Sequence, residues 1–321
     1  MRKLVFCTQR LDPDDPVLAA TVPMVRALAD RVDDLVVLCD AATVNLDGVR
    51  VREFGASTQV ARGARFESAL ARELKCDGVV AHMVPLYAVL AAPLVRPLGT
   101  PLVLWYTHWK AHAVVRAAEK VCTAVASVDA RSFPLRSSKV HGIGHGIDLG
   151  EFACTDAPEP PLRALVLGRY SPAKGLETVL EAARQAGVHV EAHGSDASFE
   201  AYKRTLQRDF PEADLGGPVP RAQLPQLFAR SHVLVNNMRA GAPDKVVYEA
   251  AASCVPVLAS NPVFDDLLPD ELRFDREDAG QLAEKLSALD LRRRPQLREI
   301  VARRHSVDHW ADALLATVAR G

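Results

Sequence analysis

The sequence has 321 residues, of which 49% are hydrophobic and 25% are charged, and its formal net charge is −1. This length predicts two globular domains, each able to bury a core of its own. The balanced charge excludes the basic surface that nucleic-acid-binding proteins carry, so no nucleic-acid partner is expected. The first 150 residues hold 18 Lys and Arg against 15 Asp and Glu. This excess permits a weak peripheral contact with an anionic membrane, although random surface composition accounts for it more simply.

Short apolar runs alternate with segments of helical periodicity in the first half of the chain. Strands are predicted at 3–8, 34–40, 49–54, 77–83, 100–108, 123–128 and 139–144, and helices at 17–31, 62–75, 86–97 and 110–121. Alternation of this kind predicts a parallel sheet with helices on both faces. Runs such as LVVL and PLVLW are apolar on both faces, as a sheet covered on both sides requires.

The proline-rich segment 152–161 interrupts this pattern and predicts a linker. Beyond it, strands at 163–168, 188–194, 232–237 and 255–260 alternate with helices at 175–186, 198–208, 244–253 and after 278, and 305–320 forms a last amphipathic helix. The expected fold is therefore α/β, with two Rossmann-like domains at 1–152 and 160–304 whose parallel sheets face a central cleft. Ligands of such sheets bind at the carboxyl ends of the strands.

The six cysteines show no metal-binding spacing, and most lie in apolar surroundings. Free thiols that behave as small hydrophobic groups are expected, as suits a reducing cytosol. The apolar stretch at the N-terminus is too short for a signal peptide, and no run is long enough to span a bilayer. The sequence thus predicts a cytoplasmic protein.

The first candidate binding segment, residues 164–184, combines a strand, a polar loop and a helix. The strand ends at Gly168, and the loop carries Arg169 and Lys174. A guanidinium and an ammonium beside a helix N-terminus form a strong site for a diphosphate. On spacing alone, both could equally be solvated loop cations.

The second segment, residues 236–260, joins a strand to an apolar helix through a loop in which Gly241 allows a ligand to approach closely. The helix begins near Asp244, and the first-turn N–H groups, at Lys245 and Val246, can hold phosphate oxygens. Glu249 needs partners in such an apolar helix, and two ribose hydroxyls would suit it. Alternatively, Lys245 and Glu249 form a surface pair four residues apart.

Polar side chains also follow strands of the first half. His108 ends the strand PLVLWY, and His82 ends the strand before it. Asp14 belongs to a DxD triplet, Asp12-Pro13-Asp14, that resembles a metal-binding motif but could equally cap the next helix. We assign His82 and Asp14 to an acceptor side of the site and assign no metal or cofactor. The glycines of HGIGHGID form no dinucleotide motif, since no helix follows them.

Five short segments together form a recognisable series: WYTH (105–108), GHGID (144–148), LGRYSPAKG (167–175), HGSD (193–196) and YEAAASCVPVLAS (248–260). The first resembles a strand-end histidine motif. The others resemble the NG-[IV]-D turn, the G-R-x-x-x-x-K-G loop, the G-x-G turn and the E-A-x-A-x-G-x-P-V segment of glycosyltransferase family 4. That family is a large group of retaining enzymes with the two-domain GT-B fold.

The resemblance implies that Arg169 and Lys174 grip the diphosphate of the donor and that Glu249 holds its ribose. His108 would lie near the transferred sugar. The final helix, 305–321, would pack back onto the first domain through Trp310.

The sequence departs from the family at three points. The family has a glutamate eight residues before Glu249, where this chain has Gly241, so Asp244 or the backbone of 241–244 would take its place in binding the donor sugar. Cys254 stands at a helix-ending position that is usually glycine and often needs positive φ, at a cost of about 1 kcal/mol. The loop 9–16 lacks the usual paired glycines.

The resemblance predicts a metal-independent, retaining glycosyltransferase that moves a hexose-type sugar from a nucleotide-diphosphate sugar to a glycan, lipid-linked or small-molecule acceptor. Two alternatives stay open. A sugar-nucleotide epimerase can share the architecture, and the missing glutamate at position 241 makes a non-catalytic nucleotide-sugar-binding module credible.

Overall fold

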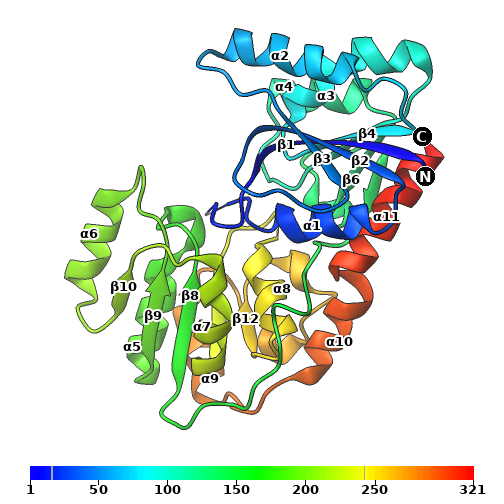
Figure 1. The fold of residues 1–321 in the computed structure, drawn as a ribbon. Coiled ribbons are helices and arrows are strands. Elements are labelled where there is room, and N and C mark those ends of the chain that lie inside the picture. Colours follow the sequence, from blue (N-terminus) through cyan, green and yellow to red (C-terminus); the bar gives the residue numbers. More distant parts are fainter. Residues whose placement is uncertain (16, 242) are drawn as a thin grey trace. The chain divides into compact units, whose positions relative to one another are not determined.

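The computed structural model of the protein describes residues 1–15, 17–241 and 243–321, so that Pro16 and Ala242 lie outside it. The chain forms two compact units, Met1–Gly146 with Arg304–Gly321, and Ile147–Arg303. Each unit holds one parallel sheet with helices around it (Figure 1). This arrangement confirms the predicted fold class.

The first unit is built on seven parallel strands in the order β3-β2-β1-β4-β5-β6-β7. They are β1 (Lys3–Leu11), β2 (Asp34–Ala42), β3 (Val49–Glu53), β4 (Gly78–His82), β5 (Leu102–Trp105), β6 (Ala124–Ser127) and β7 (Val140–Gly142). All seven were predicted. Strand β5 ends earlier than its apolar run suggests, so the segment Tyr106–His108 leaves the sheet as a loop.

The helices of the first unit cover both faces of its sheet. They are α1 (Thr21–Ala29), α2 (Gln59–Ala71), α3 (Pro85–Val95), α4 (Ala113–Val121) and α11 (Val307–Arg320), with short 3-10 turns η1 (Arg96–Leu98) and η2 (Ala130–Ser132). Helices α2, α3 and α4 lie on one face, and α1 and α11 on the other (Figure 1). Val5 and Cys7 of β1 belong to the core between the sheet and helices α2, α3 and α4. Phe6, between them, meets the fully buried Trp310 of α11 edge-on, with ring centroids 6.5 Å apart.

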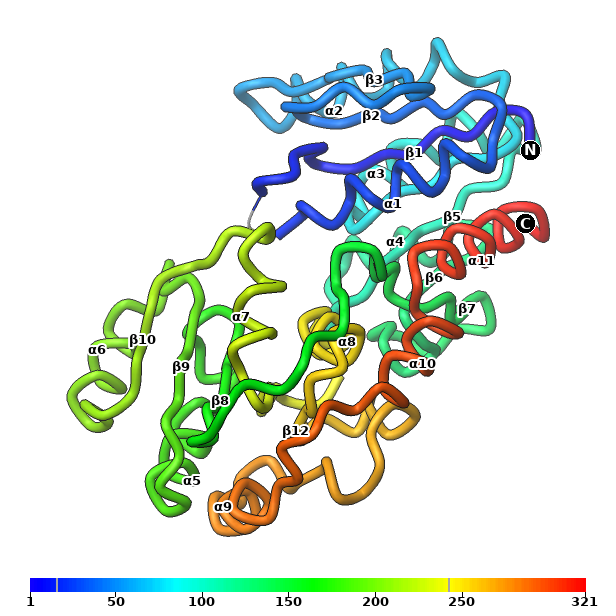
Figure 2. Tube along the Cα trace, turned by 60° about the horizontal axis from the view of Figure 1, so that its bottom comes forward, coloured from blue at the N-terminus to red at the C-terminus, as the bar shows by residue number. Residues whose placement is uncertain are grey.

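The second unit holds five parallel strands in the order β10-β9-β8-β11-β12. They are β8 (Arg163–Leu167), β9 (His189–His193), β10 (Asp214–Gly216), β11 (Val233–Asn236) and β12 (Val257–Ala259). The helices are α5 (Leu176–Ala186), α6 (Glu200–Asp209), α7 (Leu224–Arg230), α8 (Lys245–Ala252), α9 (Ala279–Ser287) and α10 (Pro295–Arg304). Four 3-10 turns are η3 (Pro172–Lys174), η4 (Arg221–Gln223), η5 (Pro262–Phe264) and η6 (Asp270–Leu272). Helices α5 and α9 lie side by side (Figure 2), and α8 packs on β11 and β12.

Two elements of the second unit, β10 and α7, were not predicted. Strand β10 is three residues long, and α7 has seven residues that follow the segment PVPRAQ (218–223). Both are too short to show a period in the sequence, and tertiary packing decides their conformation. None of the described helices is long and apolar enough to cross a membrane.

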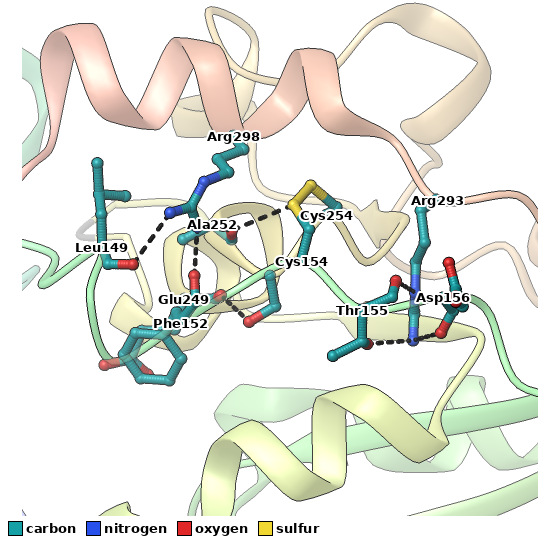
Figure 3. Close-up of a disulfide and its surroundings, with 11 residues drawn as sticks. Leu149, Phe152, Cys154, Thr155, Asp156, Glu249, Ala252, Cys254, Arg293 and Arg298 are labelled. Carbon is teal, nitrogen blue, oxygen red and sulfur yellow. Dashed lines mark hydrogen bonds between the residues drawn. A yellow bond between two sulfur atoms is a disulfide. The ribbon is translucent and has the colours of Figure 1, made fainter.

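The segment 152–161, expected to link the two domains, lies inside the second unit, whose first residue is Ile147. Two arginines hold it there (Figure 3). Arg298 donates to the carbonyl oxygens of Leu149 (3.0 Å), Phe152 and Ala252. Arg293 donates to those of Thr155 and Asp156, at 3.1 and 3.3 Å. The proline content that suggested a linker instead reflects an extended segment whose backbone is satisfied by side chains.

The expectation of free thiols throughout is wrong for Cys154 and Cys254, which form a disulfide with a Cα–Cα distance of 5.2 Å (Figure 3). It joins the extended segment to the second residue after the end of α8. Cys254 has φ 60°, which confirms the expected positive φ at this position. Because the pair is 100 residues apart in sequence, spacing gave no sign of it. Cys7, Cys39, Cys76 and Cys122 are free.

His305, just before α11, should make the fold sensitive to acid. Burial, with Arg304 and His309 nearby, lowers its pKa to about 3. As the pH falls below about 6.5, the unfolded chain binds this proton and the folded chain does not, so the free energy of unfolding decreases. We expect a loss of about 2 kcal/mol between pH 7 and pH 5 from this residue alone.

Urea unfolding at both pH values would measure this loss. The wild type should lose about 2 kcal/mol more than the His305→Gln variant. The variant His189→Gln, at an exposed position, serves as the control. Equal pH dependence of wild type and His305→Gln would contradict the prediction.

Candidate active site

Lys174 lies over the carboxyl end of β8. Gly168 follows this strand with φ 139°, and a Cβ atom there would stand 2.7 Å from the Lys174 ammonium nitrogen. Only glycine therefore permits both the backbone conformation and the position of the lysine. Arg169, the next residue, is exposed. The structure thus brings Gly168 and Lys174 together and leaves Arg169 at the surface beside them.

Asp244 is the partner of Lys174. Its Oδ2 forms an ion pair with the lysine ammonium and accepts a hydrogen bond of 2.7 Å from Asn236 Nδ2. Asn236, at the end of β11, was missed from the sequence, although a pair of asparagines that ends a buried strand is an unusual feature. Its side-chain oxygen is buried and has no hydrogen-bond partner within the described residues.

The N-terminus of α8 is left without a side-chain cap. Asp244 occupies the N-cap position with φ −76° and ψ 129°, but its carboxylate bonds Lys174 and Asn236 instead of the helix N–H groups. An aspartate at this position normally accepts from the second or third N–H of the helix. The partial positive charge at the start of α8, at Lys245 and Val246, therefore faces the same region as Lys174. Gly241, earlier in the loop, has φ 127°.

Glu249, one turn further along α8, does not form the surface pair that the sequence left open. It is 3% exposed, and its Oε1 accepts from Arg221 Nη1 at 2.6 Å. Arg221 also binds Glu151, whose pKa is raised by burial. Lys245 lies beside this cluster, and burial lowers its pKa to about 8. No sequence motif marked Arg221 or Glu151, because both lie in segments without helical or strand periodicity.

The three candidate residues of the first unit differ in their surroundings. His82 is buried, and its Nδ1 lies 3.1 Å from the hydroxyl of Thr8. His108 lies in the loop after β5, accepts from the Lys110 N–H at 3.0 Å, and stacks on Trp109. Asp14 is exposed.

The DxD triplet does not cap the turn before α1. Asp14 N–H instead bonds the Asp12 carboxylate at 3.0 Å within the loop itself. Asp15 accepts from the N–H groups of Val17 and Leu18, at 2.9 and 2.7 Å. The capping alternative considered for Asp12 and Asp14 is therefore wrong: Asp15 caps only the turn that precedes α1, and α1 itself begins without a side-chain cap.

The second unit thus gathers an ammonium, an uncapped helix N-terminus and polar strand ends at one edge of its sheet. Arg276 adds a second cation close by, since its Nη2 donates to the carbonyl oxygen of Pro172 at 3.1 Å. Such a group can bind the oxygens of a phosphate or diphosphate. The buried carboxylate of Glu249 follows on the same helix and can accept hydrogen bonds from hydroxyl groups.

Comparison with known proteins supports the fold. Residues 172–316 match the model of a family described as "Glycosyl transferase-like". No curated protein sequence matches the chain. Among solved structures, HepE from Anabaena, crystallised with UDP and glucose, superimposes with a TM-score of 0.77 at 14% identity and with full coverage of both chains.

Sucrose-phosphate synthase from Thermosynechococcus elongatus gives a TM-score of 0.74 at 14% identity and 98% coverage of each chain. UDP-GlcNAc 2-epimerase from Methanocaldococcus jannaschii gives 0.60 at 10% identity, with both chains covered in full. At these identities the likeness establishes the fold. The chain has the two-domain α/β architecture known as GT-B.

Proposed function

We propose that the protein is a metal-independent, retaining glycosyltransferase of the family 4 type. It would move a hexose-type sugar from a nucleotide-diphosphate sugar to a glycan, lipid-linked or small-molecule acceptor. The observation that carries the proposal is the ammonium of Lys174 held over Gly168 beside the uncapped start of α8. The matching family, and the UDP and glucose bound to HepE, support it.

The proposed chemistry follows from charge. Cleavage of the sugar–phosphate bond places negative charge on the leaving diphosphate, and preorganised cations and N–H groups stabilise that charge. Lys174, Arg169 and the first turn of α8 would supply this stabilisation. In a retaining reaction the acceptor attacks from the face of the leaving group, so a phosphate oxygen can accept its proton.

The other candidate residues are assigned by position. Glu249 would accept hydrogen bonds from the ribose, and the backbone at Gly241 would approach the sugar. His108 would contact the transferred sugar. His82 and Asp14 would lie on the acceptor side.

An epimerase is the second candidate, because UDP-GlcNAc 2-epimerase shares the fold. Incubation of the purified protein with UDP-, GDP- and ADP-sugars, followed by NMR of the products, distinguishes the functions. We expect slow hydrolysis or transfer that EDTA does not inhibit. An altered sugar formed without an acceptor would identify an epimerase, and binding without turnover would identify a nucleotide-sugar-binding module.

A further inference from the structure

Arg221 divides its guanidinium between two carboxylates. Its Nε and Nη2 donate to Glu151 Oε2 at 3.1 and 2.8 Å, and its Nη1 donates to Glu249 Oε1 at 2.6 Å. The guanidinium carbon also lies 5.1 Å from the centroid of the Phe152 ring. All five of its N–H groups point in fixed directions, so contacts on two edges and one face fix its orientation.

This arrangement holds one oxygen of Glu249 and leaves the other available. Oε1 is taken by Arg221, whereas Oε2 has no hydrogen-bond partner within residues 1–15, 17–241 and 243–321. A carboxylate oxygen can accept two hydrogen bonds. A buried charge with an unused acceptor is costly unless a ligand supplies donors.

Lys245 does not replace Arg221 in this role. It lies four residues before Glu249 on α8, and burial disfavours its charged form, with a pKa lowered to about 8. Arg221 stays charged because the two carboxylates raise its pKa against the effect of burial. It is therefore the permanent cation of the cluster.

We infer that Arg221 is a positioning residue: held by Glu151, it fixes the Glu249 carboxylate so that Oε2 accepts hydrogen bonds from the ribose hydroxyls of the donor nucleotide. This inference rests on the proposed function. It adds that recognition of ribose depends on a residue from η4, which precedes α7 and has no place in the motifs around Glu249.

The test compares ribonucleotide with deoxyribonucleotide binding. Isothermal titration of the wild type with UDP, GDP and ADP selects the diphosphate that binds. The same protein is then titrated with the 2′-deoxy and 3′-deoxy forms of that diphosphate. Loss of a hydrogen bond to a charged group should weaken binding of a deoxy form about ten-fold or more. In Arg221→Met the preference for ribose should fall below about three-fold.

Arg298→Met is the matched control. This arginine holds the same segment, since its hydrogen bonds go to the carbonyl oxygens of Leu149, Phe152 and Ala252 and not to the Glu249 carboxylate (Figure 3). We expect it to keep the ribose preference. Arg221→Lys retains the charge but cannot reach both carboxylates, so it should also lose the ribose preference. This variant takes the place of Arg221→Met if the methionine variant does not fold.

The outcomes separate the two proposals. If the wild type binds none of the three diphosphates, the proposed function is wrong. If the wild type binds one of them without preferring ribose, or if Arg221→Met and Arg221→Lys keep the preference, the role of Arg221 is refuted while the proposed function stands. An equal loss of the ribose preference in Arg298→Met and Arg221→Met would also refute the role of Arg221. Loosening of the segment that both arginines hold would then explain the two results.

Discussion

Replacement of Lys174 by alanine is expected to lower the turnover number for sugar transfer by about 100- to 1,000-fold, the usual effect of removing one group that stabilises a developing oxyanion. The fold should persist, since the lysine lies in a short 3-10 turn and its ammonium contacts Asp244 and the backbone at Gly168 instead of packing in the core. Steady-state kinetics with the nucleotide sugar that the NMR screen selects would measure the effect, and circular dichroism would verify the fold. Lys203→Ala is the control, because Lys203 belongs to the same unit and pairs instead with Asp196.

The ion pair between Lys174 and Asp244 raises a competing explanation, in which the lysine only neutralises a half-buried aspartate. The double variant Lys174→Ala/Asp244→Asn distinguishes the two. If the lysine binds the leaving diphosphate, removal of the aspartate charge cannot restore turnover. Recovery of activity to within about three-fold of the wild type would assign Lys174 a structural role and remove the main support for the proposed chemistry.

Asp244 has a further consequence for donor binding. A donor diphosphate must compete with this carboxylate for Lys174, since both are anions and one ammonium serves them. Asp244→Asn removes the repulsion and should strengthen binding of the nucleoside diphosphate several-fold at low salt, with a smaller gain at high salt. Titration calorimetry at two ionic strengths measures this difference. Weaker binding in the variant would instead show that Asp244 contributes favourably to the site.

Residues close in sequence were easier to predict than their partners in space. The seven strands of the first unit follow from apolar runs, and Lys174 and Gly168 belong to one loop, so the strand end alone places them near each other. Asn236 could have been recognised in the same way, as a polar residue at the end of a buried strand. The positive φ of Cys254 followed from the comparison of one position with a helix-ending glycine.

Partners that lie far apart in sequence leave no periodic signal. Glu249 needed a partner in an apolar helix, but nothing identified Arg221, 28 residues away in η4. The nearest cation in sequence, Lys245, suggested a surface pair because the four-residue spacing is common on exposed helices. Burial of Glu249 beside Arg221 and Glu151, which the sequence does not specify, invalidated that assumption.

The disulfide between Cys154 and Cys254 should be the largest single contribution to the stability of the second unit. A covalent link across 100 residues restricts the unfolded chain, and the chain-entropy estimate for such a loop is about 4 to 5 kcal/mol. Cys154 is exposed, so Cys154→Ala removes the link with little loss of packing. We expect urea unfolding to detect this loss, and a thiol reductant to produce it in the wild type but not in the variant.

Cys76→Ala is the control, since Cys76 is a free thiol of the first unit and its loss leaves the bonded pair intact. A difference of less than about 1 kcal/mol between wild type and Cys154→Ala would contradict the prediction. It would mean that Arg298 and Arg293 already hold the segment in place. The same measurement bears on the compartment, because a reducing cytosol would keep the pair as thiols and the protein there would lack this stabilisation.

Two variants of Cys254 distinguish the stabilisation by the disulfide from the cost of the positive φ at this position. A cysteine at φ 60° is disfavoured by roughly 1 kcal/mol relative to a residue with ordinary φ, whereas glycine adopts this conformation freely. Cys254→Gly therefore loses the disulfide but also removes the cost of the positive φ. Cys254→Ala loses the disulfide and keeps that cost. Both variants should be less stable than the oxidised wild type, with the glycine variant about 1 kcal/mol above the alanine variant. Under reductant, the glycine variant should have a larger free energy of unfolding than the wild type. The disulfide is then absent from both proteins, and only the cost of the positive φ at position 254 distinguishes them.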